Sequence, residues 1–384
     1  MGQGIIIPTL PLFGRSMGYS ATMIGLAVGA FALARVFLNI PAGLLTRRYG
    51  ARIALILGAV FFACGNLMTA LVFPYWAILA SRFIAGIGSA LFITAAVIFV
   101  AEVSTDANRG RLMALYWMAF LLGITLGPSA GGITAHFFGL RAPFILVALA
   151  ASVAGIWAMT RIPGYVAKSS GQSADVVGPQ PERQGGSIQT RSIFLSPNFL
   201  AISVVALAVF FTRSGALFNL FPLEGREHLN LDAGGVGLIL TIPAGVNLMC
   251  QPFVGALSDR VGRRVLIIPG IFLFVASLLL TALHPGLALF AVALTLYGIG
   301  QAIEASSGNS YVVDIAAPAQ RALALGVYRT CADVGLVVGS PLMGYLADRA
   351  GIPWAMVADA VVLLFAMAIF AVWSRPKMTL NSRV

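Results

Sequence analysis

The sequence predicts an all-α polytopic membrane protein made of two six-helix bundles related by pseudo-twofold symmetry. Three observations lead to this prediction. First, 59% of the 384 residues are hydrophobic and the mean hydropathy is +0.94, whereas a globular domain has about 45–50% apolar residues. Second, apolar runs of about 20 residues, enough to cross roughly 30 Å of hydrocarbon, recur along the chain. Third, the second half of the chain repeats the first at an offset of 212 residues.

The first apolar run, Gly4 to Phe13, is short and contains two prolines. As a helix it covers roughly 15 Å, half of a bilayer. In the repeat, a full span from Asn198 precedes Pro222, the counterpart of Pro11. We therefore expect that the sequence lacks the cytoplasmic half of its first span.

The remaining spans follow from the continuous apolar runs. In the first half we place them near 22–46, 53–73, 76–101, 112–136 and 141–161. A polar segment rich in Gly, Pro and Gln then has the composition of a flexible linker. Six more spans follow near 198–222, 234–257, 265–284, 287–313, 322–346 and 353–373. The expected organisation is a first half at 1–163, a linker at 164–196, a second half at 197–375 and a tail at 376–384.

The distribution of basic residues predicts the orientation. If the linker is cytoplasmic, most of the 24 Lys and Arg residues lie in cytoplasmic loops, and the external loops hold only Arg15, Arg141, Arg226 and Arg349. This asymmetry follows the positive-inside rule. We expect a multi-pass protein of the plasma (cell inner) membrane, with the linker and the C-terminus in the cytoplasm.

Charge and cysteine usage argue against several other classes of protein. The net charge of +11 comes from short loops and not from a basic face with interleaved aromatics, so we expect no nucleic-acid partner. Each of the three cysteines falls inside an apolar run, which implies no disulfide framework. The histidines, His136, His228 and His284, have no metal-ligand spacing, so we expect no metal site and no cofactor.

The repeat aligns without a gap and pairs glycines with glycines and arginines with arginines. Gly25 corresponds to Gly237, Arg48 to Arg260, Gly127 to Gly339 and Gly132 to Gly344. Two parallel six-span halves joined by a linker are typical of transporters, with a binding site between the halves.

The sequence of one loop occurs twice in the chain, once in each half. The intact copy contains Gly255, Asp259, Arg260, Gly262, Arg263 and Arg264, and the first-half copy contains Gly43, Arg48, Gly50 and Arg52. Glycines allow two helix ends to approach through a very short connection. Asp259 can accept hydrogen bonds from helix-terminal N–H groups or pair with a neighbouring arginine. In the first copy Arg47 stands where the second has Asp259.

Two further motifs lie within spans. Arg82-x-x-x-Gly86-x-Gly88 occupies the fourth span, and the fifth span contains Gly123, Gly127, Pro128, Gly131 and Gly132. Pro128 removes a backbone hydrogen bond and kinks the helix. The glycines leave a groove for close helix packing.

These motifs resemble the major facilitator superfamily over essentially the whole chain, and most closely its drug:proton antiporter type. The loop 255–264 fits the signature G-x-x-x-D-R-x-G-R-R at every defined position. The resemblance implies that this loop latches the cytoplasmic side in one state of the cycle and that the fifth-span motif seals the two halves. The sequence departs from the pattern at Arg47 and at Ala114, which stands at the leading glycine of the fifth-span motif.

Charged residues inside spans are expensive and are functional candidates. Glu304 shares a helix face with Tyr297 and Gln301, and the resemblance turns this face toward the central cavity. We expect Glu304 to carry a proton or pair with a cationic substrate, a structural ion pair being the alternative. Asp333 lies four residues after Arg329, with which it can pair on one helix face. Asp359 is expected to be structural.

Other polar candidates fall at matching depths. Arg35-x-x-x-Asn39 in the second span aligns with Asn247-x-x-x-Gln251 in the eighth, which indicates a gate or cavity lining, or polar contacts that hold helices together. Arg82 and Arg213 line the cavity by resemblance and can orient acids or bind an anionic group.

The function expected from the sequence is secondary active transport by alternating access. The leading hypothesis is proton-coupled efflux of small drug-like or amphipathic molecules. Alternatives are an uptake symporter or uniporter for an organic anion or sugar, and a non-transporting membrane sensor or truncated product. No nucleophile–base pair or metal constellation indicates an enzyme. We expect a monomer in the lipid bilayer with a small-molecule substrate and protons as the coupling ion.

Overall fold

The computed structural model describes residues 2–71, 74–105, 107–162, 196–317 and 320–374. Nearly all of the predicted linker and the whole of the predicted tail lie outside these ranges. The helices of the first half are α1 (Gly2–Ser16), α2 (Ala21–Tyr49), α3 (Ala51–Leu71), α4 (Tyr75–Val103), α5 (Arg109–Phe138) and α6 (Ala142–Arg161). The helices of the second half are α8 (Pro197–Thr212), η1 (Arg213–Leu220), α9 (Phe221–Glu227), α10 (Ala233–Ile239), α11 (Thr241–Val261), α12 (Arg263–Ala282), α13 (Leu287–Ile315), α14 (Arg321–Ala350) and α15 (Ile352–Trp373).

The predicted all-helical membrane architecture is confirmed. Eleven helical runs among the described residues are long and apolar enough to cross a membrane. Each span predicted from 22–46 onward coincides with one of these runs to within a few residues at either end. The helices are apolar on all sides, as membrane spans are: in α15, Leu363 is fully buried while Phe365 is 67% exposed on the outer surface.

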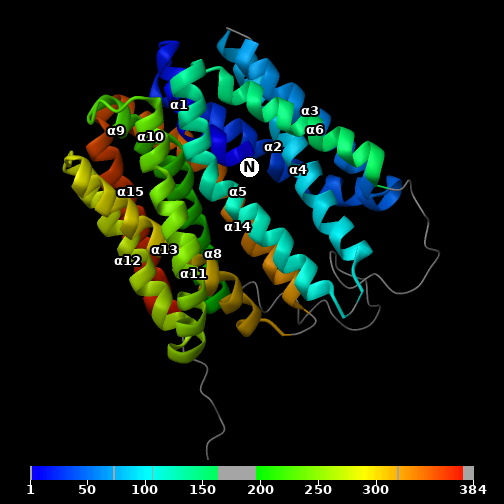
Figure 1. Ribbon diagram of the computed structural model, residues 1–384. Coiled ribbons are helices and arrows are strands. Elements are labelled where there is room, and N and C mark those ends of the chain that lie inside the picture. Colours follow the sequence, from blue (N-terminus) through cyan, green and yellow to red (C-terminus); the bar gives the residue numbers. More distant parts are fainter. Residues whose placement is uncertain (1, 72–73, 106, 163–195, 318–319, 375–384) are drawn as a thin grey trace, which may run out of the picture.

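The two halves form separate bundles that meet at one end (Figure 1). The large apolar core of the second half is centred on residues such as Phe221, Phe274 and Tyr297, and it also takes in Leu12 and Ile24 from the first half. The first half has two smaller cores, one of which contains Phe13 and Phe144. The halves are joined near α1, α9 and α10, and their opposite ends spread apart (Figure 1).

Two spans of the second half are interrupted, which the apolar pattern did not predict. The run from Pro197 to Glu227 changes from α-helix to π-helix at Arg213 and back again at Phe221. Such π-helical segments are rare in proteins, and those that occur often lie at functional sites. The run from Ala233 to Val261 is broken at Leu240, shortly before Pro243.

Glycines end four of the spans with a positive φ angle, a conformation that glycine adopts without steric cost. Gly50 and Gly262 have φ angles of 87° and 99°, and Gly139 and Gly351 have φ angles of 84° and 91°. The two members of each pair are related by the repeat, so the helix connections are also duplicated between the halves.

Candidate functional site

The halves touch through two equivalent helix seams, α2 against α14 and α5 against α10. A Cβ atom placed on Gly132 would lie 2.6 Å from the carbonyl oxygen of Ala233, and one placed on Gly344 would overlap the carbonyl of Ala21. Gly132 and Gly344 are repeat counterparts, and so are Ala233 and Ala21. The two seams are therefore related by the sequence repeat. Only glycine fits at these two helix crossings.

Both seams run to the same end of the molecule, which we call the sealed end (residues 15–22, 132–141, 227–237 and 340–350). The opposite end, which we call the open end, carries residues 43–52, 104–105, 107–111, 255–264, 314–317 and 320–321. At the open end, a Cβ placed on Gly110, Gly255 or Gly262 would meet no heavy atom within 4 Å.

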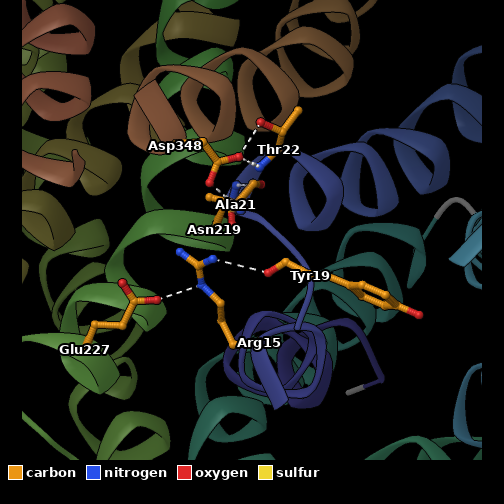
Figure 2. Close-up of polar contacts among 7 residues, drawn as sticks. All are labelled: Arg15, Tyr19, Ala21, Thr22, Asn219, Glu227 and Asp348. Carbon is orange, nitrogen blue, oxygen red and sulfur yellow. Dashed lines mark hydrogen bonds and ion pairs between the residues drawn. The ribbon is translucent and has the colours of Figure 1, made fainter. Parts of the chain in front are cut away.

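A polar network ties the halves together at the sealed end (Figure 2). The carboxylate of Asp348 in α14 accepts hydrogen bonds from the backbone N–H groups of Ala21 and Thr22, both at 2.8 Å, and from the Thr22 hydroxyl at 2.5 Å. Asp348 thus occupies the N-terminus of α2, where a carboxylate is favoured by free N–H groups and the helix dipole. Asn219 donates to the carbonyl oxygens of Ala21 and Ser340.

Two ion pairs also connect the halves. The guanidinium of Arg15 contacts the carboxylate of Glu227 at 2.7 Å and donates to the carbonyl oxygen of Tyr19 (Figure 2). In the other seam, His136 of α5 contacts Asp232, which caps α10 by accepting from the N–H of Gly235. This backbone hydrogen bond, together with His136, holds the pKa of Asp232 below its usual value.

Replacing Asp348 with asparagine is expected to weaken the sealed end. The amide retains one acceptor oxygen but loses the charge that favours the α2 N-terminus, a loss of about 1 kcal/mol, or about fivefold in the population of the sealed form. The measurement is the labelling rate of a cysteine introduced at Ala21, which is fully buried in the seam and contacts Asp348 through its backbone N–H only. Labelling in Asp348→Asn at the rate of the parent would contradict the prediction.

Midway along α2 and α14, polar side chains from both halves meet. The amide of Asn39 donates to Asp333 at 3.2 Å. The nearby cations that act on Asp333 are Arg35, from the opposite half, and Arg329. In the described part of the chain, Asp333 and Arg329 are not within ion-pair distance of each other, although the charge of Arg329 acts on Asp333 from the same helix. Asp333 is instead shared between the halves.

Glu304 lies half-buried in α13, and the hydroxyl of Tyr328 donates to its carboxylate at 3.4 Å. It borders a small cavity whose other walls are apolar, among them Val209, Ile271 and Ile303. The charge of Arg213, at the start of the π-helical segment, acts on Glu304. This carboxyl therefore faces the interior of the second bundle, with one hydroxyl donor and one cation in its surroundings.

Tyr297 and Gln301 lie on the same face of α13 as Glu304, as predicted, and both are buried. The ring of Tyr297 packs edge-on against Phe221 and Phe274, with centroid separations of 5.4 and 4.8 Å. Its hydroxyl finds no hydrogen-bond partner among the described residues. At the position of Tyr297, this face of α13 therefore points into the core of the second bundle.

Arg82 is a buried cation without an acid. Its side chain is 4% exposed, donates to the amide oxygen of Asn66 at 3.2 Å and lies 5.0 Å from the ring centroid of Phe31. In the described part of the chain no carboxylate pairs with it. The fourth-span motif predicted a role for Arg82, whereas Asn66 was not predicted; its signal in the sequence is an amide inside an otherwise apolar span.

Asn247 and Gln251 are half-buried in α11, and the amide oxygen of Asn247 has no partner among the described residues. Among the described residues, no hydrogen bond joins them to Arg35 and Asn39, their respective repeat counterparts, and Asn39 bonds to Asp333 instead. Asp359 is fully buried in α15 and accepts from Thr212 at 2.7 Å. It therefore contacts α8, and its structural role stays a prediction.

At the open end, the loop 255–264 connects helices of its own half. Arg263 pairs with Asp314, contacts Asp259 at 3.4 Å and donates to the carbonyl oxygen of Ser310 at 2.8 Å. Arg264 donates to Ser374 and to the carbonyl oxygen of Ala371. Arg260 and Asp259 are exposed. The contacts of this loop named here, all among described residues, lie within the second half, and the latch implied by the family resemblance stays a prediction.

The first-half copy keeps only part of this pattern. Arg52 donates to the carbonyl oxygen of Met159 in α6, and Met159 is the repeat counterpart of Ala371, so this contact is duplicated. Arg48 lies 5.3 Å from the ring centroid of Tyr49. Ala51 stands at the position of Arg263, so the ion pair of Arg263 with Asp314 has no counterpart here.

The fifth-span motif divides between two faces of α5. A Cβ on Gly127 would lie 2.5 Å from the Cα atom of Gly4 in α1, and one on Gly131 would overlap the carbonyl of Ile5. Gly123 contributes a backbone oxygen to the same contact with α1. Only Gly132 and Pro128 face α10. The motif was expected to seal the two halves, but most of its glycines pack α5 within the first half.

Comparisons with known proteins agree with this architecture. The sequence profile of the Major Facilitator Superfamily matches residues 1–235 and 208–383. An uncharacterized MFS-type transporter of Methanocaldococcus jannaschii is 25% identical over 352 residues, 92% of this chain and 89% of its own. Multidrug resistance protein 2 of Bacillus subtilis is 25% identical over 390 residues, 98% of this chain and 92% of its own.

Solved structures show the same fold. A bacterial homologue of the human lysosomal transporter Spinster has a TM-score of 0.81 at 16% identity, over 97% of this chain and 92% of its own. The nucleoside transporter NupG has a TM-score of 0.80 at 14% identity, over 97% of this chain and 96% of its own. With eleven candidate spans, a duplicated architecture and a family match along nearly its whole length, the chain belongs to the Major Facilitator Superfamily and is a multi-pass membrane transporter.

Proposed function

We propose that this transporter couples the efflux of small, drug-like or amphipathic molecules to proton entry by alternating access. The observation that carries the proposal is Glu304: a carboxyl inside a membrane span that accepts a hydrogen bond from a tyrosine hydroxyl, in surroundings that are otherwise apolar. Intramembrane acids of this kind are found in proton relays.

The sealed and open ends support alternating access. The halves contact each other through symmetric glycine crossings at one end, whereas the loops at the other end are exposed and separate. The open end holds most of the basic loop residues among those described: Arg47, Arg48, Arg52, Arg109, Arg111, Arg161, Arg260, Arg263, Arg264 and Arg321. By the positive-inside rule this end is cytoplasmic, so the structure corresponds to a state that opens inward.

Two observations favour a small lipophilic cation as the substrate class. Relatives over nearly the whole chain include the multidrug resistance proteins 1 and 2 of Bacillus subtilis. A carboxyl beside apolar side chains, including Phe274 and Ile303, would suit the charge and the apolar body of a lipophilic cation once this small cavity widens during the cycle.

A second candidate is transport of an organic anion. Arg82 is buried without a carboxylate partner in the described part of the chain, and the Nε atom of Arg35 is buried without a hydrogen-bond partner there. Arginine is well suited to bind carboxylate and phosphate groups.

The test uses the purified protein in liposomes with an imposed pH gradient and a fluorescent lipophilic cation as the probe. We expect the cation to accumulate on the acidic side, and collapse of the gradient by a protonophore to stop accumulation. Transport that is indifferent to the gradient would contradict proton coupling, and transport of an organic anion but no cation would favour the second candidate.

A further inference from the structure

Three metal-ligating side chains converge at the sealed end of the second half, away from the central polar residues. Glu224 lies in α9, His228 directly follows that helix, and His284 lies in the connection between α12 and α13. One potential ligand atom from each lies within 4.8 Å of the other two. The histidines are 56 residues apart in the chain, so no sequence spacing indicated the cluster.

The cluster is already held in place. His284 contacts the carboxylate of Glu224 through Nδ1 at 2.8 Å, and His228 contacts the carbonyl oxygen of His284 through Nε2 at 2.9 Å. The two imidazole rings lie with their centroids 4.4 Å apart. His284 has a φ of 50°, and its N–H donates to the carbonyl oxygen of Thr281. Glu224 and His228 are four residues apart, which places them on one side of a helical turn.

Glu224 is the member of the cluster whose surroundings favour a bound cation. Its side chain is 1% exposed, and its Oε2 atom has no hydrogen-bond partner among the described residues. A buried carboxylate with one unsatisfied oxygen is costly unless a positive charge compensates it. Both histidines are exposed, so an ion can approach Glu224 from the solvent.

We propose that Glu224, His228 and His284 form a binding site for a divalent cation of the zinc class. Two imidazoles and one carboxylate are the ligand set of several zinc sites, in which a water molecule completes the tetrahedron. Bonds of about 2.0–2.2 Å place tetrahedral ligand atoms about 3.4 Å apart, which rotation of these side chains can reach. Mg²⁺ and Ca²⁺ prefer oxygen ligands and do not suit a site with two nitrogens.

Binding has two physical consequences. The imidazole nitrogens must be unprotonated to bind the ion, so the affinity falls as the pH is lowered. The ligands all belong to the second half, so the ion connects α9 with the α12–α13 connection and stabilises this bundle in proportion to its occupancy. The site is independent of the proposed proton coupling.

The test is calorimetric titration of Zn²⁺ into the purified full-length protein at pH 7.5, after removal of any histidine tag and treatment with a chelator. We expect one ion per chain and a raised melting temperature. His228→Ala and His284→Ala should each weaken binding at least about tenfold, and Glu224→Gln likewise. His136→Ala is the matched control, because His136 pairs with Asp232 outside the cluster, and it should bind as the parent does.

Co²⁺ provides a test that needs no variant. In the unmodified protein, Co²⁺ bound to these ligands should show the intense visible absorption of a four-coordinate ion, which Zn²⁺ then removes. The absence of saturable Zn²⁺ binding, binding that survives both histidine substitutions, or the weak spectrum of a six-coordinate ion would each overturn the proposal.

Discussion

Glu304→Gln is expected to abolish transport driven by a pH gradient and to leave the protein folded. Glutamine has nearly the same shape as glutamate and keeps an oxygen that can accept from the Tyr328 hydroxyl, so the packing around the small apolar cavity is preserved. It cannot gain or lose a proton, so a cycle that carries its proton on this side chain loses its driving force. Accumulation in liposomes should fall to the level of protein-free liposomes.

A second assay separates coupling from general damage. Exchange of substrate across the membrane without a gradient requires substrate binding and alternating access but no proton transfer. We expect it to persist in Glu304→Gln at a raised substrate concentration, which compensates for the lost attraction between the carboxylate and a cation. Glu182→Gln, in the predicted linker, carries the same chemical change away from the spans and serves as the control. Gradient-driven accumulation that is unchanged in Glu304→Gln removes this residue from the coupling mechanism.

Gly132→Ala is expected to shift the protein away from the state described here. The added methyl group would lie 2.6 Å from both the carbonyl oxygen of Ala233 and the Cα atom of Gly237. These are backbone atoms, so the contact can be relieved only by moving α5 away from α10. Overpacking of this kind costs about 1–3 kcal/mol, which corresponds to about a 5–150-fold change in the balance between sealed and separated seams.

Spin labels measure this shift directly. Cysteines introduced at Phe138 and Trp354, both exposed near the sealed end of opposite halves, carry the labels in a background without Cys64, Cys250 and Cys331. We expect longer distances in Gly132→Ala and, because of the repeat, also in Gly344→Ala. Gly245→Ala is the matched control, since its Cβ meets no heavy atom within 4 Å. Identical distance distributions in all three variants would refute the seam model.

The sequence predicted the spans well for a physical reason. A backbone that crosses hydrocarbon must satisfy its own hydrogen bonds in a helix, so a long apolar run translates into a span with few alternatives. The sequence repeat also predicts equivalent contacts in the two halves. Arg52 donates to the carbonyl oxygen of Met159 as Arg264 does to that of Ala371. The helix crossing at Gly132 is equivalent to the one at Gly344. The interruption of a span at Arg213 had no signal in hydropathy, because a π-helical turn has the same composition as an α-helical one.

The candidate site was less predictable, because helix periodicity shows which residues share a face but not what that face meets. Asp333 was paired with Arg329 on its own helix, whereas its hydrogen bond comes from Asn39 of the other half. Gly127 and Gly132 belong to one motif but contact different helices. Glu224 and His284 lie 60 residues apart and meet only because α9 packs beside the end of α12.

By itself, the sequence determined that this chain is a duplicated, multi-pass helical membrane protein of the transporter class, since hydropathy and repeat register are local properties of the chain. Only the tertiary structure decided which end of the two bundles is sealed, which polar groups face one another across the seam and where a cation site can form. Those features depend on how two rigid bundles are oriented relative to each other and on how helix ends pack. In a transporter this orientation changes during the cycle, so the same sequence must be compatible with more than one arrangement of the two bundles.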